Sequence, residues 1–239
     1  MTTWNGSAIP SSLAALFDDI GAHGPAGGRK RWGLGWLVHY AKEVRRRRRF
    51  MAAYGWTVPT PAAISAAGDF VGDRQLLEIG AGNGLWAYLL SAYGVAVTAT
   101  DDHSWAAPPP GVKTKPPSGF PVQPGRFYPV EQLDAQEAVQ KYQAHHALLL
   151  CWPPYGKSMA FRALSAFQGD RMVYIGDKGC TADDVFHAEL QQRWQQQDII
   201  HVPTWPGIHD AVYLYERKVE NWQPRRTDRR RNPHLSSSG

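Results

Sequence analysis

Residues 74–94, RQLLEIGAGNGLWAYLLSAYG, are the stretch that most restricts how this chain can fold. A short apolar run leads into three alternating glycines, Gly80, Gly82 and Gly84, and the helical pattern that follows is closed by Gly94. A buried strand that turns through glycines into a helix brings its backbone close to a ligand and directs free amides toward negative charge. The stretch therefore predicts a strand–helix unit with a ligand at the turn.

Similar units follow along the rest of the chain. Apolar runs alternate with helical patterns, which predicts an α/β fold with a mainly parallel sheet and right-handed crossovers. The last two strands follow each other across a Pro-Gly turn without a helix, so we expect the last strand to run antiparallel. Further strands are expected at 95–102, 126–133, 145–152, 171–178, 198–205 and 210–218, and helices at 85–94, 134–143, 158–167 and 182–197.

The chain of 239 residues is long enough for one sizeable α/β domain with an extension. We place an N-terminal arm and a basic helical extension at 1–55, the α/β domain at 56–218, and a basic tail that is expected to be disordered at 219–239. Seven of the eighteen prolines lie in 104–125, which predicts a long functional loop.

The first part of the chain divides further. Residues 1–28 are small and punctuated by Gly and Pro, with one short amphipathic candidate, SSLAALFDDI, so a loose arm is expected there. Apolar residues recur at helical spacing over 29–54. A second helix is expected to begin at Thr60-Pro61, a hydroxyl cap followed by proline, and to end at Gly68.

Composition favours a cytoplasmic globular protein. The apolar fraction is 43% and the charged fraction 20%, and the sequence has neither a secretory signal pattern nor a long apolar run. Cys151 and Cys180 stand without a CxxC or a His–Cys cluster, so no metal site is expected.

The net charge of +5 is unevenly distributed. Residues 51–216 are net −6, whereas the two ends together are +11, and much of that charge lies in Arg45–Arg49. Positive charge of this kind suits phosphate or acidic partners. For the arginine run, contact with RNA or DNA and a plain solvated helix face are equally good interpretations. For the tail the solvated interpretation is preferred.

The glycine turn and the acids that follow it resemble those of class I S-adenosylmethionine-dependent methyltransferases over roughly residues 56 to 217. The spacing GxGxG after a strand-borne acid, with acids ending the next strand, separates it from the GxGxxG of dinucleotide-binding enzymes. The resemblance implies that the turn lies against the methionine part of the cofactor and that Asp101, or else Asp102, holds the ribose. The turn residues implied are Glu78, Gly80, Ala81, Gly82 and Gly84.

The resemblance implies further cofactor contacts. The segment LDAQEAV is similar to the motif after the third strand, which makes Asp134 a candidate for the adenine amino group, although a helix N-cap explains it equally well. The segment GWTVPTPAAI looks like the Thr-Pro segment of one class of DNA amino-methyltransferases. Thr60 is therefore a candidate for the cofactor carboxylate, with Tyr54 and Trp56 as lids, and an ordinary capped helix is the alternative. The resemblance also makes Cys151 a candidate cofactor contact.

The segment LCWPPYG, residues 150–156, resembles the Asp/Asn-Pro-Pro-Tyr motif of amino-methyltransferases. The resemblance implies catalytic positions at Trp152, Pro153, Pro154 and Tyr155, with a proline carbonyl against the amine and an aromatic ring on a flat substrate. Trp152 departs from the motif, because an indole only donates hydrogen bonds and cannot replace the Asp/Asn acceptor. It can stack on a planar group or face a cation.

Two further segments carry open alternatives. His209 beside Asp210 could be a general base, but a turn histidine bonded to its neighbour is the preferred interpretation. Asp177 or Lys178 could reach the substrate, and a helix start capped at Thr181 explains much of that segment without catalysis.

These patterns together predict a Rossmann-like class I methyltransferase fold that uses S-adenosyl-L-methionine. The acceptor is expected to be planar or nitrogenous, a small molecule or a nucleobase, stacked near Trp152 and Tyr155. The alternative is a non-catalytic module with this fold that binds RNA or a protein partner through its basic ends.

Overall fold

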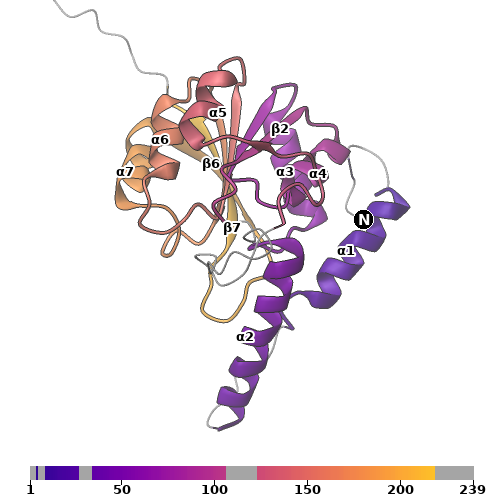
Figure 1. The fold of residues 1–239 in the computed structure, drawn as a ribbon. Coiled ribbons are helices and arrows are strands. Elements are labelled where there is room, and N and C mark those ends of the chain that lie inside the picture. The colour runs from indigo at the N-terminus through magenta and orange to yellow at the C-terminus, as the bar shows by residue number, and fades with distance from the viewer. Residues whose placement is uncertain (1–3, 5–8, 27–33, 106–122, 219–239) are drawn as a thin grey trace, which may run out of the picture.

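The computed structural model describes residue 4 and residues 9–26, 34–105 and 123–218 (Figure 1). Its centre is a seven-stranded sheet with the strand order β3-β2-β1-β4-β5-β7-β6. Neighbouring strands are parallel except at β7, which runs antiparallel to both β5 and β6. The strands are β1 Leu76–Ile79, β2 Val97–Asp101, β3 Glu131–Gln132, β4 Ala147–Cys151, β5 Arg171–Gly176, β6 Trp194–His201 and β7 Ala211–Arg217. The predicted α/β fold, with seven strands and a reversed last strand, is confirmed.

Helices cover both faces of the sheet (Figure 1). Side chains alternate along each strand, so Leu76 packs in the core on one face and Leu77 in the core on the other. Both faces are buried, as a parallel sheet requires. On the first face lie α3 Pro61–Val71 and α4 Leu85–Tyr93, and on the second α5 Ala135–Lys141, α6 Met159–Ala166 and α7 Asp184–Arg193.

Two N-terminal helices, α1 Ser11–His23 and α2 Leu34–Tyr54, extend the first face. The expected loose arm over 1–28 is wrong where the structure describes it, because Trp4, Leu13 and Ile20 are buried in the same core as the sheet. The ring of Trp4 packs edge-on against Tyr93 of α4, with centroids 5.2 Å apart. The apolar side of α1 thus supplies core residues that composition alone did not reveal.

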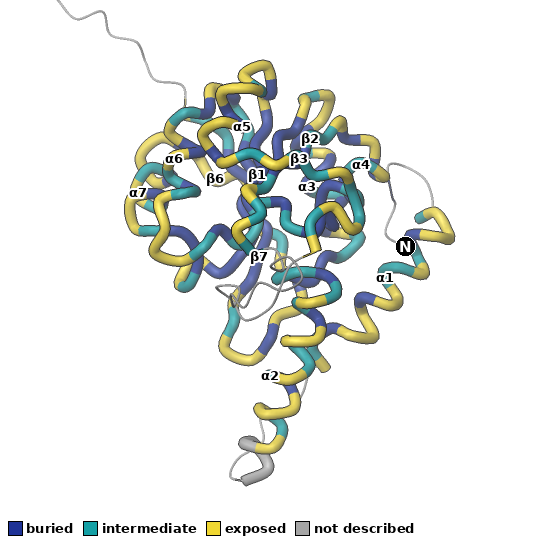
Figure 2. Tube along the Cα trace, viewed as in Figure 1, coloured by how far each residue is buried: buried dark blue, intermediate teal, exposed yellow. Residues whose placement is uncertain are grey.

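Helix α2 projects from the body, and much of its outer half is exposed (Figure 2). Near its inner half, Arg46 donates hydrogen bonds to the backbone carbonyls of Ala22 and His23 at the end of α1. These carbonyls have no partner within their own helix, so the guanidinium stabilises that end. No helix in the described ranges has the length and hydropathy needed to cross a bilayer.

Two predicted boundaries are wrong, each for a packing reason. Helix α3 continues past Gly68 to Val71, and Gly68 instead makes room for the ring of Tyr93. Helix α7 ends at Arg193 and β6 begins at Trp194, although 182–197 reads as helical. Pairing with β7 outweighs the helical preference of the glutamines in this segment.

The remaining differences concern β3 and the parts of the chain outside the described residues. The strand expected at 126–133 is reduced to the two residues of β3. Most of the proline-rich segment and the tail at 219–239 lie outside the described residues, so the predictions for them stay predictions.

We predict that Gly68→Ala destabilises the protein by about 2 kcal/mol, a typical cost of overpacking. A Cβ at Gly68 would lie 2.2 Å from Cδ1 of Tyr93, and the ring would have to move within a filled core. Chemical denaturation measures the change. Gly21→Ala is the matched control, since a Cβ at this helical position meets no atom within 4 Å. It should be neutral or stabilising by up to about 1 kcal/mol, and equal effects at the two positions would contradict the packing role.

Candidate functional site

A cavity of about 660 Å³ lies at the ends of β1, β2 and β4. The strand order reverses between β1 and β4, and ligands of open α/β sheets bind outside the strand ends at such a point. The cavity is lined by most of the predicted site residues: Glu78, Gly80, Ala81, Gly82, Asp101, Asp102, Cys151, Trp152, Pro153, Pro154 and Tyr155.

The expectation of free amides at the glycine turn is wrong for Gly80, Ala81 and Gly82, whose amides donate to the Thr100 carbonyl and to Asp101. Gly80, Gly82 and Gly84 have φ of 74°, 55° and 77°, in the left-handed region where a Cβ is unfavourable. Gly84 does not line the cavity, and its role is different, because a Cβ there would lie 2.9 Å from the carbonyl oxygen of Tyr128. Gly84 therefore permits close packing of the 123–130 segment, while Gly80 and Gly82 border the cavity.

Asp101 is held rigidly at the end of β2. Its carboxylate accepts hydrogen bonds from the backbone amides of Gly82, at 2.9 Å, and His103, at 2.6 Å. Burial raises its pKa, and these two amides oppose the rise. A carboxylate has about four acceptor positions, so capacity remains for ligand hydroxyls. Asp102 is exposed and accepts from the Ser104 amide at 2.8 Å, which makes Asp101 the better-positioned acid.

Glu78 is a buried acid beside the glycine turn, with only 2% of its surface exposed. It accepts a hydrogen bond from the backbone amide of Ala87 in the first turn of α4. Its Oε2 atom has no hydrogen-bond partner among the described residues. Burial, together with the nearby Asp101, raises the pKa of Glu78 to about 8. A buried, half-satisfied carboxyl is costly and invites a donor or a cation from a ligand.

Trp152 follows β4 with a left-handed backbone, φ 51°. Its ring stacks on Trp56 with centroids 5.2 Å apart, and the Cζ atom of Arg47 lies 5.4 Å from its ring centroid. Its Nε1 donates to Oδ1 of Asp210 at 3.0 Å. The indole N–H is therefore used within the protein, and stacking of an acceptor on this ring stays a prediction.

Asp210 is a buried carboxyl in the loop between β6 and β7. Burial raises its pKa to about 7, opposed by the Trp152 indole and by the positive charge of Arg47. Thr57 donates to its Oδ2 at 3.4 Å. Asp210 does not line the cavity, and its carboxylate links the segments that follow α2 and β4 to the β6–β7 loop.

Two carbonyls in the rest of the WPPY segment accept hydrogen bonds from backbone amides. The Pro153 carbonyl accepts from the Ala182 amide at 2.9 Å, and the Pro154 carbonyl from the Lys157 amide at 3.3 Å. Tyr155 is 71% exposed at the cavity rim. Each carbonyl keeps a second lone pair, so the predicted contact with an amine stays a prediction.

The non-glycine residues with left-handed backbone, among those described, are His103, Trp152 and Ala182. Trp152 lines the cavity, His103 donates to Asp101, and Ala182 donates to Pro153. Backbone strain of this kind concentrates at functional sites.

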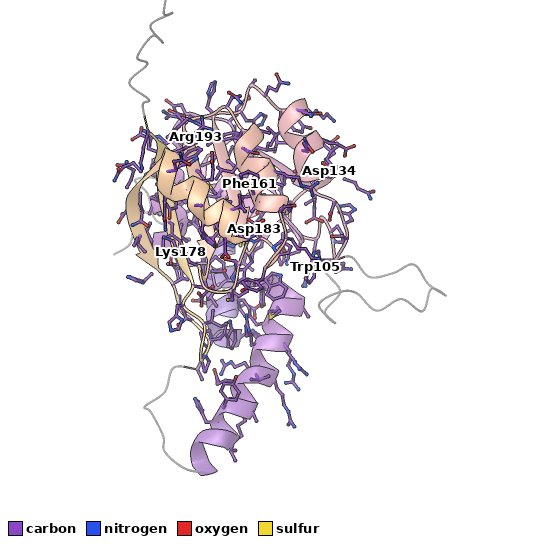
Figure 3. The ribbon with its side chains drawn as sticks, turned by 90° about the vertical axis from the view of Figure 1, so that its left-hand side faces the viewer. Trp105, Asp134, Phe161, Lys178, Asp183 and Arg193 are labelled. Atoms are coloured by element: carbon purple, nitrogen blue, oxygen red, sulfur yellow. The ribbon has the colours of Figure 1, made fainter. Side chains whose placement is uncertain are left out.

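Besides Gly84, two predicted residues do not line the cavity. Thr60 caps α3 and accepts from the Ala63 amide at 3.2 Å. Asp134 is exposed and forms a capping box on α5 with Glu137, and Figure 3 shows it apart from Trp105. Its neighbours Leu133 and Ala135 do line the cavity, so this loop reaches the site through other residues.

The His209 and Lys178 alternatives lie outside the cavity as well. The His209 side chain is exposed, with Nδ1 3.4 Å from Asp177. The Nζ atom of Lys178 lies over the ring of Tyr213, 4.0 Å from its centroid. In the part of the chain that is described, no three His, Cys, Asp or Glu side chains are grouped to hold a metal ion.

Sequence reasoning missed several cavity residues, among them Asn83, Trp86 and Trp105. Asn83 lies inside the glycine motif and accepts from the Leu85 amide at 3.1 Å, so its position in the motif could have identified it. Trp105 packs edge-on against Trp56 at 6.0 Å, and Trp86 lines the cavity from α4. Neither tryptophan has a sequence signal that separates it from core aromatics.

The strand order 3-2-1-4-5-7-6 with a reversed β7 is that of the Rossmann-like class I methyltransferase fold. No protein-family model and no curated protein matches the chain.

Several solved structures align with the chain. A proposed S-adenosylmethionine-dependent methyltransferase from Streptococcus mutans aligns with 66% of this chain at 7% identity and TM-score 0.44, and this chain spans about half of it, 49%. The 1,6-didemethyltoxoflavin-N1-methyltransferase of Burkholderia thailandensis aligns at 15% identity and TM-score 0.44, over 82% of this chain and 94% of that one. Magnesium protoporphyrin IX methyltransferase from Synechocystis aligns at 11% identity and TM-score 0.43, over 87% and 92%.

We predict that Glu78→Gln stabilises the protein at alkaline pH. Folded Glu78 keeps its proton up to a pKa of about 8, whereas the unfolded chain loses it near 4.5. The folded state therefore binds more protons between these values, and the free energy of unfolding falls as pH rises through this window. The amide removes this loss, which is on the order of 4 kcal/mol at pH 8.

Denaturation of both proteins from pH 5 to pH 8 tests this. The half-exposed Glu216→Gln is the control for loss of one carboxylate and should keep the wild-type pH profile. If Glu78→Gln and wild type lose stability in parallel over this range, the buried-acid assignment is wrong.

Proposed function

We propose that this protein is an S-adenosyl-L-methionine-dependent methyltransferase. The observation that carries the proposal is the Glu78 carboxyl, buried against the cavity with Oε2 unpartnered among the described residues. Few ligands supply a positive group to a buried acid beside a glycine turn, and the α-ammonium of an amino-acid-bearing nucleoside is one that does.

The residues around Glu78 fit the rest of this cofactor. Gly80 and Gly82 leave space at the turn because neither carries a Cβ. Asp101, fixed by two amides, would accept the ribose hydroxyls. The apolar wall that includes Leu133 and Met159 suits the adenine ring and the thioether region. When bound, the cofactor supplies a methyl group on a sulfonium centre.

The chain itself would orient the acceptor and exclude water. The rings of Trp56, Trp105 and Trp152 form one aromatic side of the cavity region. Transfer of a sulfonium methyl depends on aligning the acceptor atom with the methyl group more than on acid–base chemistry. An aromatic wall that excludes water would hold a flat acceptor in that alignment. We therefore propose a planar or nitrogenous acceptor positioned between these rings and Tyr155. The alternative is a non-catalytic module with this fold. Titration with the cofactor distinguishes this module from a methyltransferase.

A second candidate role, contact with nucleic acid, rests on the basic side of α2. A hollow of about 490 Å³ between α1 and α2 is lined by Lys42, Arg45, Arg46 and Arg49, and no acid is among the described residues that line it. The Arg46 guanidinium already donates hydrogen bonds to backbone carbonyls at the end of α1. Lys42, Arg45 and Arg49 follow one helix face at positions i, i+3 and i+7. This face suits phosphates of a strand that carries the acceptor base.

We predict that Gly82→Val lowers affinity for S-adenosylmethionine and S-adenosylhomocysteine at least about 100-fold. The new side chain would fill the cavity border, and its backbone at φ 55° would be strained. Isothermal titration measures both ligands. Gly72→Val is the matched control, because it puts valine at φ 61° after α3, away from the cavity. If wild type binds neither ligand, the methyltransferase proposal fails. If Gly82→Val binds like Gly72→Val, the cofactor lies elsewhere.

We predict that the double variant Arg45→Glu, Arg49→Glu weakens binding of a mixed single-stranded oligonucleotide. Loss of two phosphate contacts should reduce the slope of log affinity against log salt by about 1.4. Fluorescence anisotropy between low and physiological salt gives the slope. Lys141→Glu with Arg193→Glu makes the same charge change on α5 and α7 and should lower affinity much less. Equal losses in the two double variants would show that only net charge matters.

A further inference from the structure

A second cavity of about 390 Å³ lies between α2 and the loop that joins β6 to β7. In Figure 1 this loop runs beside the inner end of α2, and Phe50 packs edge-on against Trp205 with centroids 5.5 Å apart. Met51, Trp56 and Trp105 line both this cavity and the larger one. The two cavities therefore share a wall, and a ligand in the second lies next to the proposed cofactor cavity.

Two buried hydrogen-bond donors among the lining residues lack partners. Trp205 is 2% exposed, and its Nε1 atom has no partner in the described part of the chain. The Nε atom of Arg47 is likewise buried and unpartnered there. Indole and guanidinium groups donate only, and a buried donor without an acceptor is unfavourable. A ligand that supplies oxygen acceptors would remove both costs.

The charges around this cavity favour an anion. Arg47 and Arg48 line it, and Glu43 is the acid among its described lining residues. Glu43 accepts from the Ala26 amide at 3.2 Å, so its carboxylate is engaged toward the N-terminal segment. Asp210, the other acid near Arg47, is bonded to Trp152 and Thr57. Arg47 makes no ion pair within 4 Å with any acid of the described ranges. Its charge acts on Asp210 and on the Trp152 ring, and its Nε atom is left for a ligand oxygen.

The walls of the cavity favour a flat ligand. Aromatic rings of Tyr40, Trp56, Trp105 and Trp205 line it. Rings of this kind stack on planar groups and add to affinity beyond the area they bury. The volume lies within the range of small-molecule sites, and it is too small for a folded partner.

We propose that the second cavity binds a planar aromatic molecule carrying an oxyanion, a carboxylate or a phosphate, whose oxygens accept from Arg47 and Trp205. This molecule is the methyl acceptor, an inference that rests on the proposed function. Its anionic group is held in the second cavity, and its ring extends past Trp56 and Trp105 into the larger cavity.

Isothermal titration with three probes of one ring system tests the ligand class: 2-naphthoate, 2-naphthyl phosphate and the neutral 2-naphthamide. Either anion should bind wild type at least about 10-fold more tightly than the amide, as a charge-assisted hydrogen bond requires. The better of the two anions distinguishes carboxylate from phosphate. Equal binding of all three probes, or binding of none, overturns the proposal.

Variants locate the site. Arg47→Met should weaken the anion at least about 10-fold, and Trp205→Phe, which keeps a ring but removes the N–H, about 5-fold. Arg45→Met is the matched control, since Arg45 is exposed and lines the hollow between α1 and α2 instead. It should change affinity less than 2-fold. Wild-type affinity in Arg47→Met places the anion elsewhere and overturns the proposal, and the amide comparison remains decisive if a variant does not fold.

Titration of the same proteins with S-adenosylhomocysteine separates this inference from the proposed function. Trp205 lines the second cavity and not the larger one, so Trp205→Phe should bind S-adenosylhomocysteine like wild type. If the protein binds the cofactor but not the anions, the proposal for the second cavity fails and the methyltransferase proposal stands. Anion binding without cofactor binding rejects the methyltransferase proposal and leaves an anion site.

Discussion

Parallel pairing of β1 with β2 and β4 is the constraint on which the rest of the site depends. The register sets Ile79 beside both Thr100 and Leu150, so the three strands end at the same level. Glu78, Asp101 and Cys151 therefore meet around one cavity although they are far apart in sequence. The amides of Gly80 and Ala81 then bond to the Thr100 carbonyl, and the Gly82 amide bonds to Asp101. Each of these contacts follows from the shared level of the strand ends.

Much of this could be predicted from sequence, because it depends on local pattern. The glycines at 80, 82 and 84 require left-handed backbone, and alternating apolar runs specify a parallel sheet. The places where prediction failed depend on contacts distant in sequence. Gly68 looks like a helix stop but accommodates Tyr93, and the glutamines after Arg193 look helical but pair with β7. Local propensity cannot report either partner.

The candidate site divides in the same way. Residues on the glycine turn and at strand ends were predictable, whereas the network of Arg47, Thr57, Trp152 and Asp210 joins four separate segments. The arginine run illustrates the limit. Five arginines span more than one helical turn, so one or two of them were expected to face the protein. The sequence could not tell that Arg46 holds the end of α1 and that Arg47 turns toward Trp152. Only tertiary packing assigns neighbouring arginines to such different tasks.

The left-handed residues His103, Trp152 and Ala182 have a consequence for how the rim of the cavity moves. Each holds a conformation that costs on the order of 1 kcal/mol or more, and each lies in a connecting segment and not in the sheet. Segments under such strain open locally at lower free energy than the strands beneath them. Amide hydrogens at the rim should then exchange sooner than those of β1 and β4. A ligand that spans the rim would slow exchange of the rim amides while exchange in the sheet stays the same. The rigidity of the rim would then belong to the complex more than to the free chain.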